Sequence, residues 1–197
     1  MIAIQTFPVY LMRDVITVST TALLVIDIQC GAFDGVRCSP IDRAFELVAN
    51  ASSLITAARD AGSLVVFVQH CAESGAPFEE GTPHWALHEQ LVPIAGEPVI
   101  KKYASSSFEN TNLGEILQRL AVKNLILCGL QSEICVRNTG NAALDLGYMV
   151  RVAEDGHSTW PSEGKSSAAI STGVNKELVA RGAILDSTAN LVAMFRA

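Results

Sequence analysis

The chain has 197 residues, of which 49% are hydrophobic and 17% are charged, a balance typical of a globular protein. This length fits a single domain, taken as residues 1–197, and a net charge of −6 with scattered Lys and Arg argues against a nucleic-acid partner. The sequence has no run of about 18 apolar residues, the length needed to cross a membrane. Residues 1–20 lack a signal-peptide pattern, so we expect a cytoplasmic protein.

Predicted strands and helices alternate along the chain. Continuous apolar runs predict strands at 22–28, 64–68, 99–100, 125–128, 148–153 and 183–185. Helices are predicted at 39–60, 111–120, 135–146 and 162–181 and after residue 187, with Ser39, Thr111, Ser162 and Ser187 as N-caps. Strands that are apolar throughout indicate a mostly parallel sheet with helices on both faces, which is a three-layer α/β/α sandwich.

The segment between the second and third predicted strands, residues 71–97, shows little periodicity. A loop of this length in a compact domain is usually functional. We expect it to help form a binding pocket, and whether a neighbouring subunit also contributes stays open. The low charge content leaves apolar surface for subunit contacts, so we expect a homo-oligomer, either a dimer or a tetramer.

Three reactive side chains lie at or just beyond the ends of predicted strands: Asp27, Lys102 and Cys135. Ligands of parallel α/β folds bind beyond the carboxyl ends of the strands, so all three are expected at one edge of the sheet. Each has a plainer explanation. Asp27 would cap a loop or pair with an Arg, Lys102 would form a solvated pair with Lys101, and Cys135 would be a buried structural thiol.

Cys135 is the strongest candidate for chemistry. It is one of five cysteines, at positions 30, 38, 71, 128 and 135, which are odd in number and contain no C-x-x-C pair, so neither a disulfide framework nor a zinc ribbon is indicated. It is predicted on the first turn of a helix, where the macrodipole favours the thiolate. Unpaired N–H groups of the turn from Gly129 to Cys135 would bind an oxyanion, so together the features describe acyl transfer through a thioester.

Three motifs in this order give the chain its resemblance to a known family. They are the sequences Leu-Leu-Val-Ile-Asp-Ile-Gln at 23–29, Val-Ile-Lys-Lys at 99–102 followed by Ser-Ser-Phe at 106–108, and Gly-Leu-Gln-Ser-Glu-Ile-Cys-Val at 129–136. The chain resembles the isochorismatase-like cysteine hydrolases, which include nicotinamidases, N-carbamoylsarcosine amidase and ureidoacrylate-type amidohydrolases. Ser107 stands where this family has Ala, which is a mild departure.

The resemblance implies roles for particular residues. Asp27 would be the general base, Lys102 its electrostatic partner and Cys135 the nucleophile. It also implies a cis peptide bond between Leu130 and Gln131, with the N–H groups of Gln131 and Cys135 facing the oxyanion.

No metal or other cofactor is predicted. The Asp-Trp-His signature of metal-binding nicotinamidases is absent here, where the sequence reads Gln-His-Cys-Ala-Glu from position 69. His70, His84 and His88 are therefore expected to be solvated or to pack in the loop. His157 could form a Cys-His-Asp triad with Cys135. We do not adopt this interpretation, because Asp27 and Lys102 already supply the base and the positive charge that the thiol needs.

The predicted function is hydrolysis of a C–N bond in a small amide or ureido compound, through a Cys135 thioester. Phe33, Trp85 and Phe108 are the candidates for the pocket walls. Two alternatives stay open: an isochorismatase-type vinyl-ether hydrolase, which needs no thiol, and a ligand-binding protein that keeps the fold without catalysis.

Overall fold

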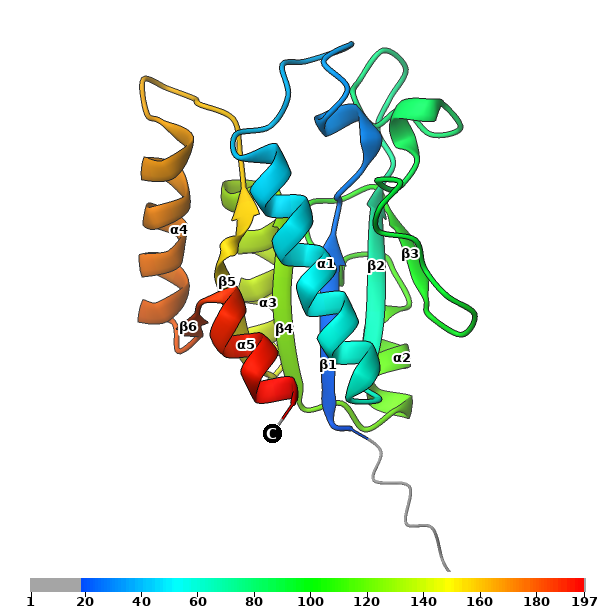
Figure 1. Cartoon of the computed structure of the whole chain (residues 1–197), viewed down its shortest axis with the longest axis vertical. Coiled ribbons are helices and arrows are strands. Elements are labelled where there is room, and N and C mark those ends of the chain that lie inside the picture. Colours follow the sequence, from blue (N-terminus) through cyan, green and yellow to red (C-terminus); the bar gives the residue numbers. More distant parts are fainter. Residues whose placement is uncertain (1–18, 197) are drawn as a thin grey trace, which may run out of the picture.

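The computed structural model describes residues 19–196, and its centre is a six-stranded, all-parallel sheet (Figure 1). The strands are β1 (Thr21–Ile26), β2 (Leu64–His70), β3 (Val99–Lys102), β4 (Asn124–Leu130), β5 (Met149–Ser158) and β6 (Ile184–Asp186). They lie in the order β3-β2-β1-β4-β5-β6, so β1 and β4 occupy the middle of the sheet. The predicted parallel α/β architecture is confirmed.

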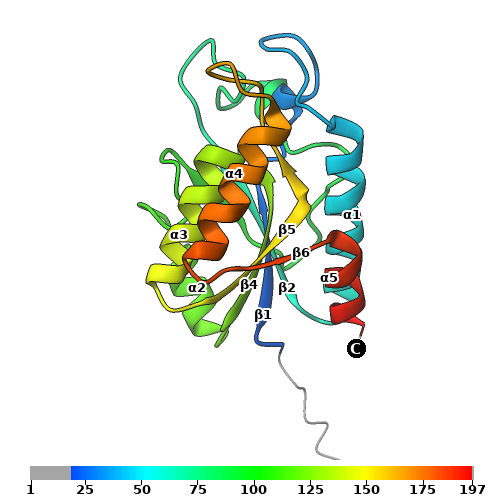
Figure 2. The same cartoon turned by 90° about the vertical axis from the view of Figure 1, so that its left-hand side faces the viewer.

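Helices cover both faces of the sheet (Figure 2). They are α1 (Ala44–Asp60), α2 (Leu113–Arg119), α3 (Arg137–Asp145), α4 (Ser167–Ala180) and α5 (Thr188–Phe195). Helices α1 and α5 lie on one face, and α2, α3 and α4 lie on the other. Among the described residues, none of these helices has the length and apolar character needed to span a bilayer.

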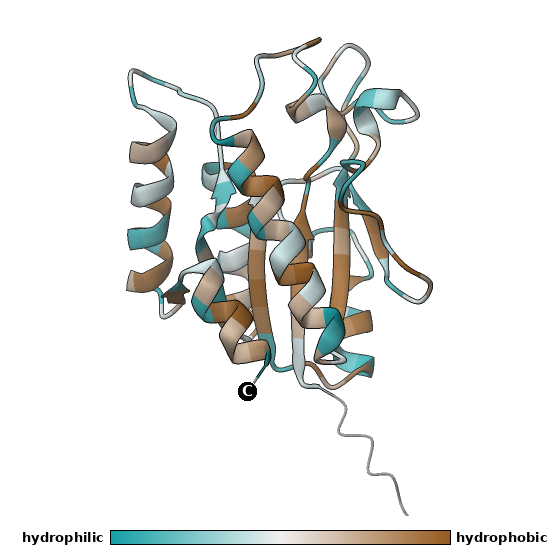
Figure 3. Cartoon of the chain, viewed as in Figure 1, coloured by the Kyte–Doolittle hydropathy of each residue, from teal (hydrophilic) through white to brown (hydrophobic). Residues whose placement is uncertain are grey.

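The continuous apolar strands supply two separate cores. Successive strand residues point to opposite faces of a sheet, so Leu23 packs with α1 and α5 whereas Leu24 packs with α2, α3 and α4. Both side chains are fully buried. Figure 3 shows the central strands as the most hydrophobic part of the chain. A sheet buried on both sides has no polar face, which explains why the strands do not alternate in the sequence.

Four helix starts differ from the sequence prediction: α2 has Asn112 rather than Thr111 as its N-cap, α3 begins at Arg137 rather than Cys135, and α1 and α4 also begin later than predicted. Helix α1 begins at Ala44 rather than Ser39, because Arg43 directly before it has a left-handed backbone with φ of +52°, which a right-handed helix cannot include. Helix α4 begins at residue 167, and its N-cap is Ser166, whose hydroxyl accepts from the Ala169 N–H, rather than Ser162. The predicted cap of the last helix, Ser187, is confirmed.

The carboxyl ends of the strands lie at one edge of the sheet, where the longer loops gather at the top of Figure 1. Residues 27–43 follow β1, residues 71–98 follow β2, and residues 159–166 follow β5. Each connection leaves the sheet on the same side because parallel strands all end there. This edge positions the candidate site.

Candidate active site

Asp27, Lys102 and Cys135 meet at this edge of the sheet. Asp27 follows β1, Lys102 is the last residue of β3, and Cys135 lies in a turn after β4. The Lys102 ammonium lies 2.8 Å from Asp27 Oδ2 and donates to Cys135 Sγ at 3.0 Å. All three side chains are buried. The structure therefore brings together the three residues that were predicted from separate motifs.

Strand geometry decides between the two adjacent lysines. Lys102 is buried, and its ammonium also donates to the carbonyl oxygens of Ala104 and Ser105 at 3.1 and 3.5 Å. Lys101 points to the other side of the strand, where its ammonium pairs with Glu80 at 2.6 Å in a largely exposed position. Only Lys102 faces the cluster, and its several acceptors fix the direction of its charge.

Burial governs the protonation of the three groups. Desolvation raises the pKa of the Asp27 carboxyl, although Lys102 opposes the shift. Desolvation, with Asp27 adding to it, raises the pKa of the Cys135 thiol to about 12, against the lowering effect of Lys102. The charges of Asp27 and Cys135 also outweigh desolvation at Lys102 and raise its pKa. The prediction of a thiolate favoured by the helix dipole is therefore wrong for the resting site.

The pKa shifts of Asp27, Cys135 and Lys102 describe a cluster that has no net charge and one mobile proton. Asp27 and Cys135 are two acids beside one cation, so a single proton shared between them leaves the buried site without net charge. Removing that proton to solvent would leave two negative charges beside one positive charge. The cluster is therefore best described as one proton shared between the Asp27 carboxyl and the Cys135 thiol beside the Lys102 ammonium.

The chain around Cys135 is held in an unusual backbone path. The Leu130–Gln131 peptide bond is cis, as the resemblance implies. Cys135 follows within a π-helical turn, Ser132–Val136, and α3 begins only at Arg137, so this residue is not on the first turn of an α-helix as predicted. A turn of this kind occurs frequently at functional sites.

Gly129 allows β4 to approach β1 just before this turn. Its φ is +128°, and a Cβ there would lie 2.0 Å from the carbonyl oxygen of Ile26. Ile26 directly precedes Asp27, so the close contact sets the spacing between the strand that carries Asp27 and the turn that carries Cys135. Only glycine fits this position without moving one of the two strands.

A buried hydrogen-bond network supports the other side of the turn. Ser132 Oγ lies 2.7 Å from His157 Nδ1 and 2.9 Å from Ser171 Oγ, and His157 Nε2 lies 2.8 Å from Asn175 Oδ1. His157 is fully buried, and it does not line the cavity that contains Cys135. Its contacts are those of a residue that links β5 and α4 to the turn.

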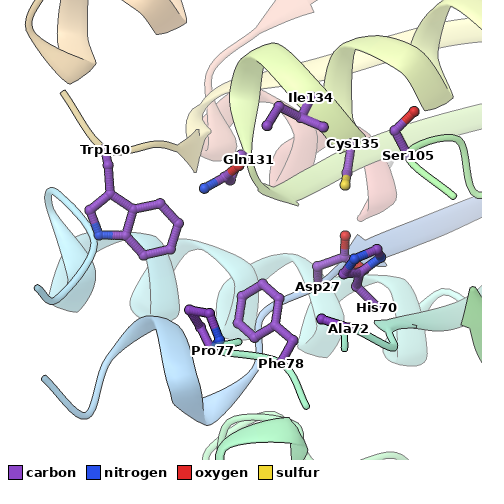
Figure 4. Close-up of a pocket in the computed structure, with 10 residues that line it drawn as sticks. All are labelled: Asp27, His70, Ala72, Pro77, Phe78, Ser105, Gln131, Ile134, Cys135 and Trp160. Atoms are coloured by element: carbon purple, nitrogen blue, oxygen red, sulfur yellow. The ribbon is translucent and has the colours of Figure 1, made fainter. Parts of the chain in front are cut away.

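Asp27 and Cys135 open into a cavity of about 280 Å³, shown in Figure 4. Ten residues line it: Asp27, His70, Ala72, Pro77, Phe78, Ser105, Gln131, Ile134, Cys135 and Trp160. Cys135 and Gln131 lie along one wall, Phe78 and Pro77 lie across from them, and Trp160 stands at the side away from Asp27. The cavity is thus a small chamber with reactive groups at one end.

The three aromatic residues predicted as pocket walls do not line this cavity. Phe33 packs edge-on against His88 at 4.7 Å, Trp85 lies beneath the Lys101 ammonium at 4.6 Å, and Phe108 stacks on Tyr148 at 5.9 Å. Each residue lies in or near a segment that approaches the site, but its ring packs against these other side chains instead of facing the cavity.

The sequence analysis missed the walls formed by Phe78 and Trp160. Phe78 comes from the long segment 71–97, from which Trp85 rather than Phe78 was predicted as a pocket wall. His70, expected to be solvated or to pack in the loop, instead lines the cavity, and its buried Nδ1 has no hydrogen-bond partner among the described residues. Burial, together with the charge of Lys102, lowers the pKa of His70, so its imidazole is neutral at pH 7.

The other two loop histidines lie away from Cys135. His84 Nδ1 lies 2.5 Å from Asp34 Oδ2, and His88 contacts Phe33. Within residues 19–196, no three His, Cys, Asp or Glu side chains come together in a way that could hold a metal ion.

Comparison with known proteins places this geometry in a family. The family model of the isochorismatase domain matches residues 21–185, which is most of the chain. The chain belongs to the isochorismatase family. A solved structure of an isochorismatase from Pseudomonas putida KT2440 superposes with a TM-score of 0.79 at 31% identity, covering 87% of this chain and 89% of that one. The chain is therefore an isochorismatase-family hydrolase by sequence and by fold.

Two curated relatives of this family member are named for hydrolases. It is 37% identical to a streptothricin hydrolase from Streptomyces noursei over 139 residues, which cover 71% of this chain and 50% of that protein. It is 26% identical to the ureidoacrylate amidohydrolase RutB from Azorhizobium caulinodans over 177 residues, which cover 71% of this chain and 77% of that protein. The chain spans only about half the length of the streptothricin hydrolases it matches.

Proposed function

We propose that this protein hydrolyses a C–N bond of a small amide or ureido compound, with Cys135 as the nucleophile. The observation that carries the proposal is the buried cluster at the end of the cavity. There the Lys102 ammonium lies 3.0 Å from Cys135 Sγ and 2.8 Å from Asp27 Oδ2. A thiol with an adjacent base and a fixed cation is the arrangement that nucleophilic catalysis requires.

In the first half of the reaction, Asp27 accepts the Cys135 proton as Sγ attacks the substrate carbonyl carbon. The Sγ–C bond forms and the carbonyl π electrons move to oxygen. The oxyanion is held by the N–H groups of Gln131 and Cys135, two residues that line the cavity. When the C–N bond breaks, Asp27 returns the proton to the departing nitrogen, and a thioester remains on Cys135.

In the second half, water replaces the departed amine. Asp27 accepts a proton from this water as its oxygen attacks the thioester carbon. The C–Sγ bond then breaks, the acid product leaves, and the proton returns to Cys135. Throughout both halves Lys102 compensates whichever of its two neighbours carries the negative charge, so the buried site never holds an uncompensated anion.

The raised pKa of Cys135 fits this sequence of proton transfers. A thiol with a pKa of about 12 is not ionised at neutral pH, so it needs a base that acts during the attack. The raised pKa of Asp27 makes that carboxylate a stronger base than an exposed one. The names of the streptothricin hydrolase and the ureidoacrylate amidohydrolase support C–N chemistry for this chain, whereas its own substrate is to be identified.

The test is a screen of primary amides and ureides for ammonia release, followed by variants with the substrate that is found. Cys135→Ala is expected to lower turnover by about 10⁴-fold or more, and rapid acid quenching of the wild type should trap an acylated Cys135 peptide. Cys128→Ala is the matched control, because Cys128 does not line the cavity and lies outside residues 30–42. Full turnover by Cys135→Ala would refute the thioester route.

The vinyl-ether alternative gives a different pattern in the same experiment. It requires the general acid but not the thiol, so activity would survive Cys135→Ala and disappear in Asp27→Ala. The contact between Lys102 Nζ and Cys135 Sγ favours the thioester route, because an ether hydrolase gains nothing from a cation held against a thiol.

A further inference from the structure

The residues that line the cavity also indicate the size and polarity of the substrate, in addition to the bond that is broken. The apolar part of the lining consists of Ala72, Pro77, Phe78, Ile134 and Trp160. The chamber of about 280 Å³ corresponds to roughly nine molecules of liquid water, which is the size of one ring carrying an amide. An apolar chamber with a few polar groups at one end is typical of a site for a small, mostly apolar ligand.

The cavity also lacks a charge that a charged ligand could use. Among the described residues, neither Arg nor Lys lines it. Asp27 is the one ionised lining group, and its charge is already compensated by Lys102 at 2.8 Å. His70 is neutral at pH 7 because burial lowers its pKa. The hydroxyl oxygen of Ser105 already accepts a hydrogen bond from Asn138 at 2.9 Å.

Both aromatic walls are anchored to one segment, residues 30–42. The Trp160 indole N–H donates to the carbonyl of Ser39 at 2.6 Å. Arg37 pairs with Glu79 at 2.7 Å and donates to the carbonyl of Ala76, which holds the strip that contains Phe78. The walls are therefore fixed before a ligand arrives, and pre-organisation of this kind favours one ligand shape over others.

We propose that the substrate is an uncharged amide or ureide whose body is a single apolar ring or a branched alkyl group seated between Phe78 and Trp160, and that carboxylate- and ammonium-bearing analogues are excluded. This inference rests on the proposed function of the site. In this proposal the reacting carbonyl lies between Cys135 and Gln131 and the body is directed towards the rings of Phe78 and Trp160, all four of which are drawn in Figure 4. A carboxylate on that body would be buried without a cation, which is strongly unfavourable.

The test uses three alkylating probes of matched shape, so it does not depend on finding the substrate. They are N-benzyl-2-chloroacetamide and its 4-carboxy and 4-aminomethyl derivatives. In each reaction the Cys135 Sγ–C bond forms, the C–Cl bond breaks, chloride leaves and the thiol proton passes to Asp27. Labelling of the Cys135 peptide is followed by mass spectrometry, and each rate is divided by that of the same probe with glutathione.

The expected result is that the neutral probe labels Cys135 about 100-fold faster than either charged probe. Phe78→Ser and Trp160→Ser should lower the neutral rate by about tenfold, whereas Phe45→Ser, whose ring is 85% exposed outside the cavity, should not. Ile134→Arg, at a rim residue that is 41% exposed, should raise the 4-carboxy rate about fivefold, and Ile134→Gln is its uncharged control.

The outcomes separate this inference from the proposed function. Equal or faster labelling by a charged probe would overturn the substrate class while leaving Cys135 as an accessible nucleophile. Labelling of Cys135 by none of the probes, nor by iodoacetamide, would overturn both. If the preference for the neutral probe is the same in the wild type, Phe78→Ser and Trp160→Ser, then these two side chains do not form the walls that contact the ligand body.

Discussion

Asp27→Asn is the substitution that most directly tests how the site handles its proton. The change keeps the shape of the side chain, removes its charge and prevents it from accepting a proton as a carboxylate does. In the wild type, the thiol proton can pass to Asp27 without leaving the protein. The population of Cys135 thiolate is then independent of pH as long as the pair holds one proton. In Asp27→Asn, the thiolate forms only when the proton is lost to solvent.

The structure gives the size of the accompanying pKa change. Asp27 Oδ2 and Cys135 Sγ contact the same ammonium at 2.8 and 3.0 Å. They are therefore no more than about 6 Å apart, where two charges interact by about 3 kcal/mol at an effective dielectric constant of about 20. This energy corresponds to about two pKa units. Asp27→Asn should therefore lower the pKa of Cys135 from about 12 by about two units.

The assay is peptide-resolved alkylation with short pulses of iodoacetamide between pH 6 and 10. Wild-type Cys135 is expected to show a rate that is flat across neutral pH, whereas the rate in Asp27→Asn should rise about tenfold per pH unit until it saturates. Cys38 in the same samples is the internal reference. A wild-type rate that rises with pH as steeply as that of the variant would refute the claim that Asp27 takes the proton.

Three further substitutions test the supports of the site. Lys102→Met should cost about 3–5 kcal/mol of unfolding free energy in urea. The cost should be smaller at pH 5 than at pH 8, because acid neutralises the buried Asp27 that loses its partner; an equal cost at both pH values would contradict this. Gly129→Ala should cost more than about 4 kcal/mol or prevent folding, because its Cβ would meet a carbonyl at 2.0 Å, whereas Gly173→Ala, with open space around its Cβ, should be neutral or stabilising. His157→Phe removes the imidazole hydrogen bonds to Ser132 and Asn175, so it should cost about 1–3 kcal/mol in the same measurement, and an unchanged midpoint would show that the network is not structural.

The three reactive residues could be placed from the sequence because their positions depend on regular structure. Parallel strands end at one edge of a sheet, so Asp27, Lys102 and Cys135 had to approach one another once the strands were identified. The choice between the adjacent lysines came from the resemblance to the family, and the strand geometry agrees with it, because Lys102 is turned inward and Lys101 outward.

The cavity walls could not be placed in the same way. Phe78 and Trp160 reach the site on irregular segments whose paths depend on contacts with residues 30–42. No period in the sequence reports such contacts. The start of α1 was mispredicted because the left-handed backbone of Arg43, which ends the loop after Ser39, leaves no signal in the residue type. The protonation of Cys135 was mispredicted because the helix dipole can be read from sequence, whereas burial beside Asp27 cannot.

Under the proposed function, the anchoring of both aromatic walls to residues 30–42 would separate selectivity from reactivity. The proposed bond breaking uses groups mounted on the sheet and on the turn after β4, and the bonds that anchor the two walls to residues 30–42 involve none of those groups. Altering this segment would shift the aromatic rings and leave the proton path intact. A library confined to residues 30–42 is therefore the economical way to redirect this enzyme to new substrates.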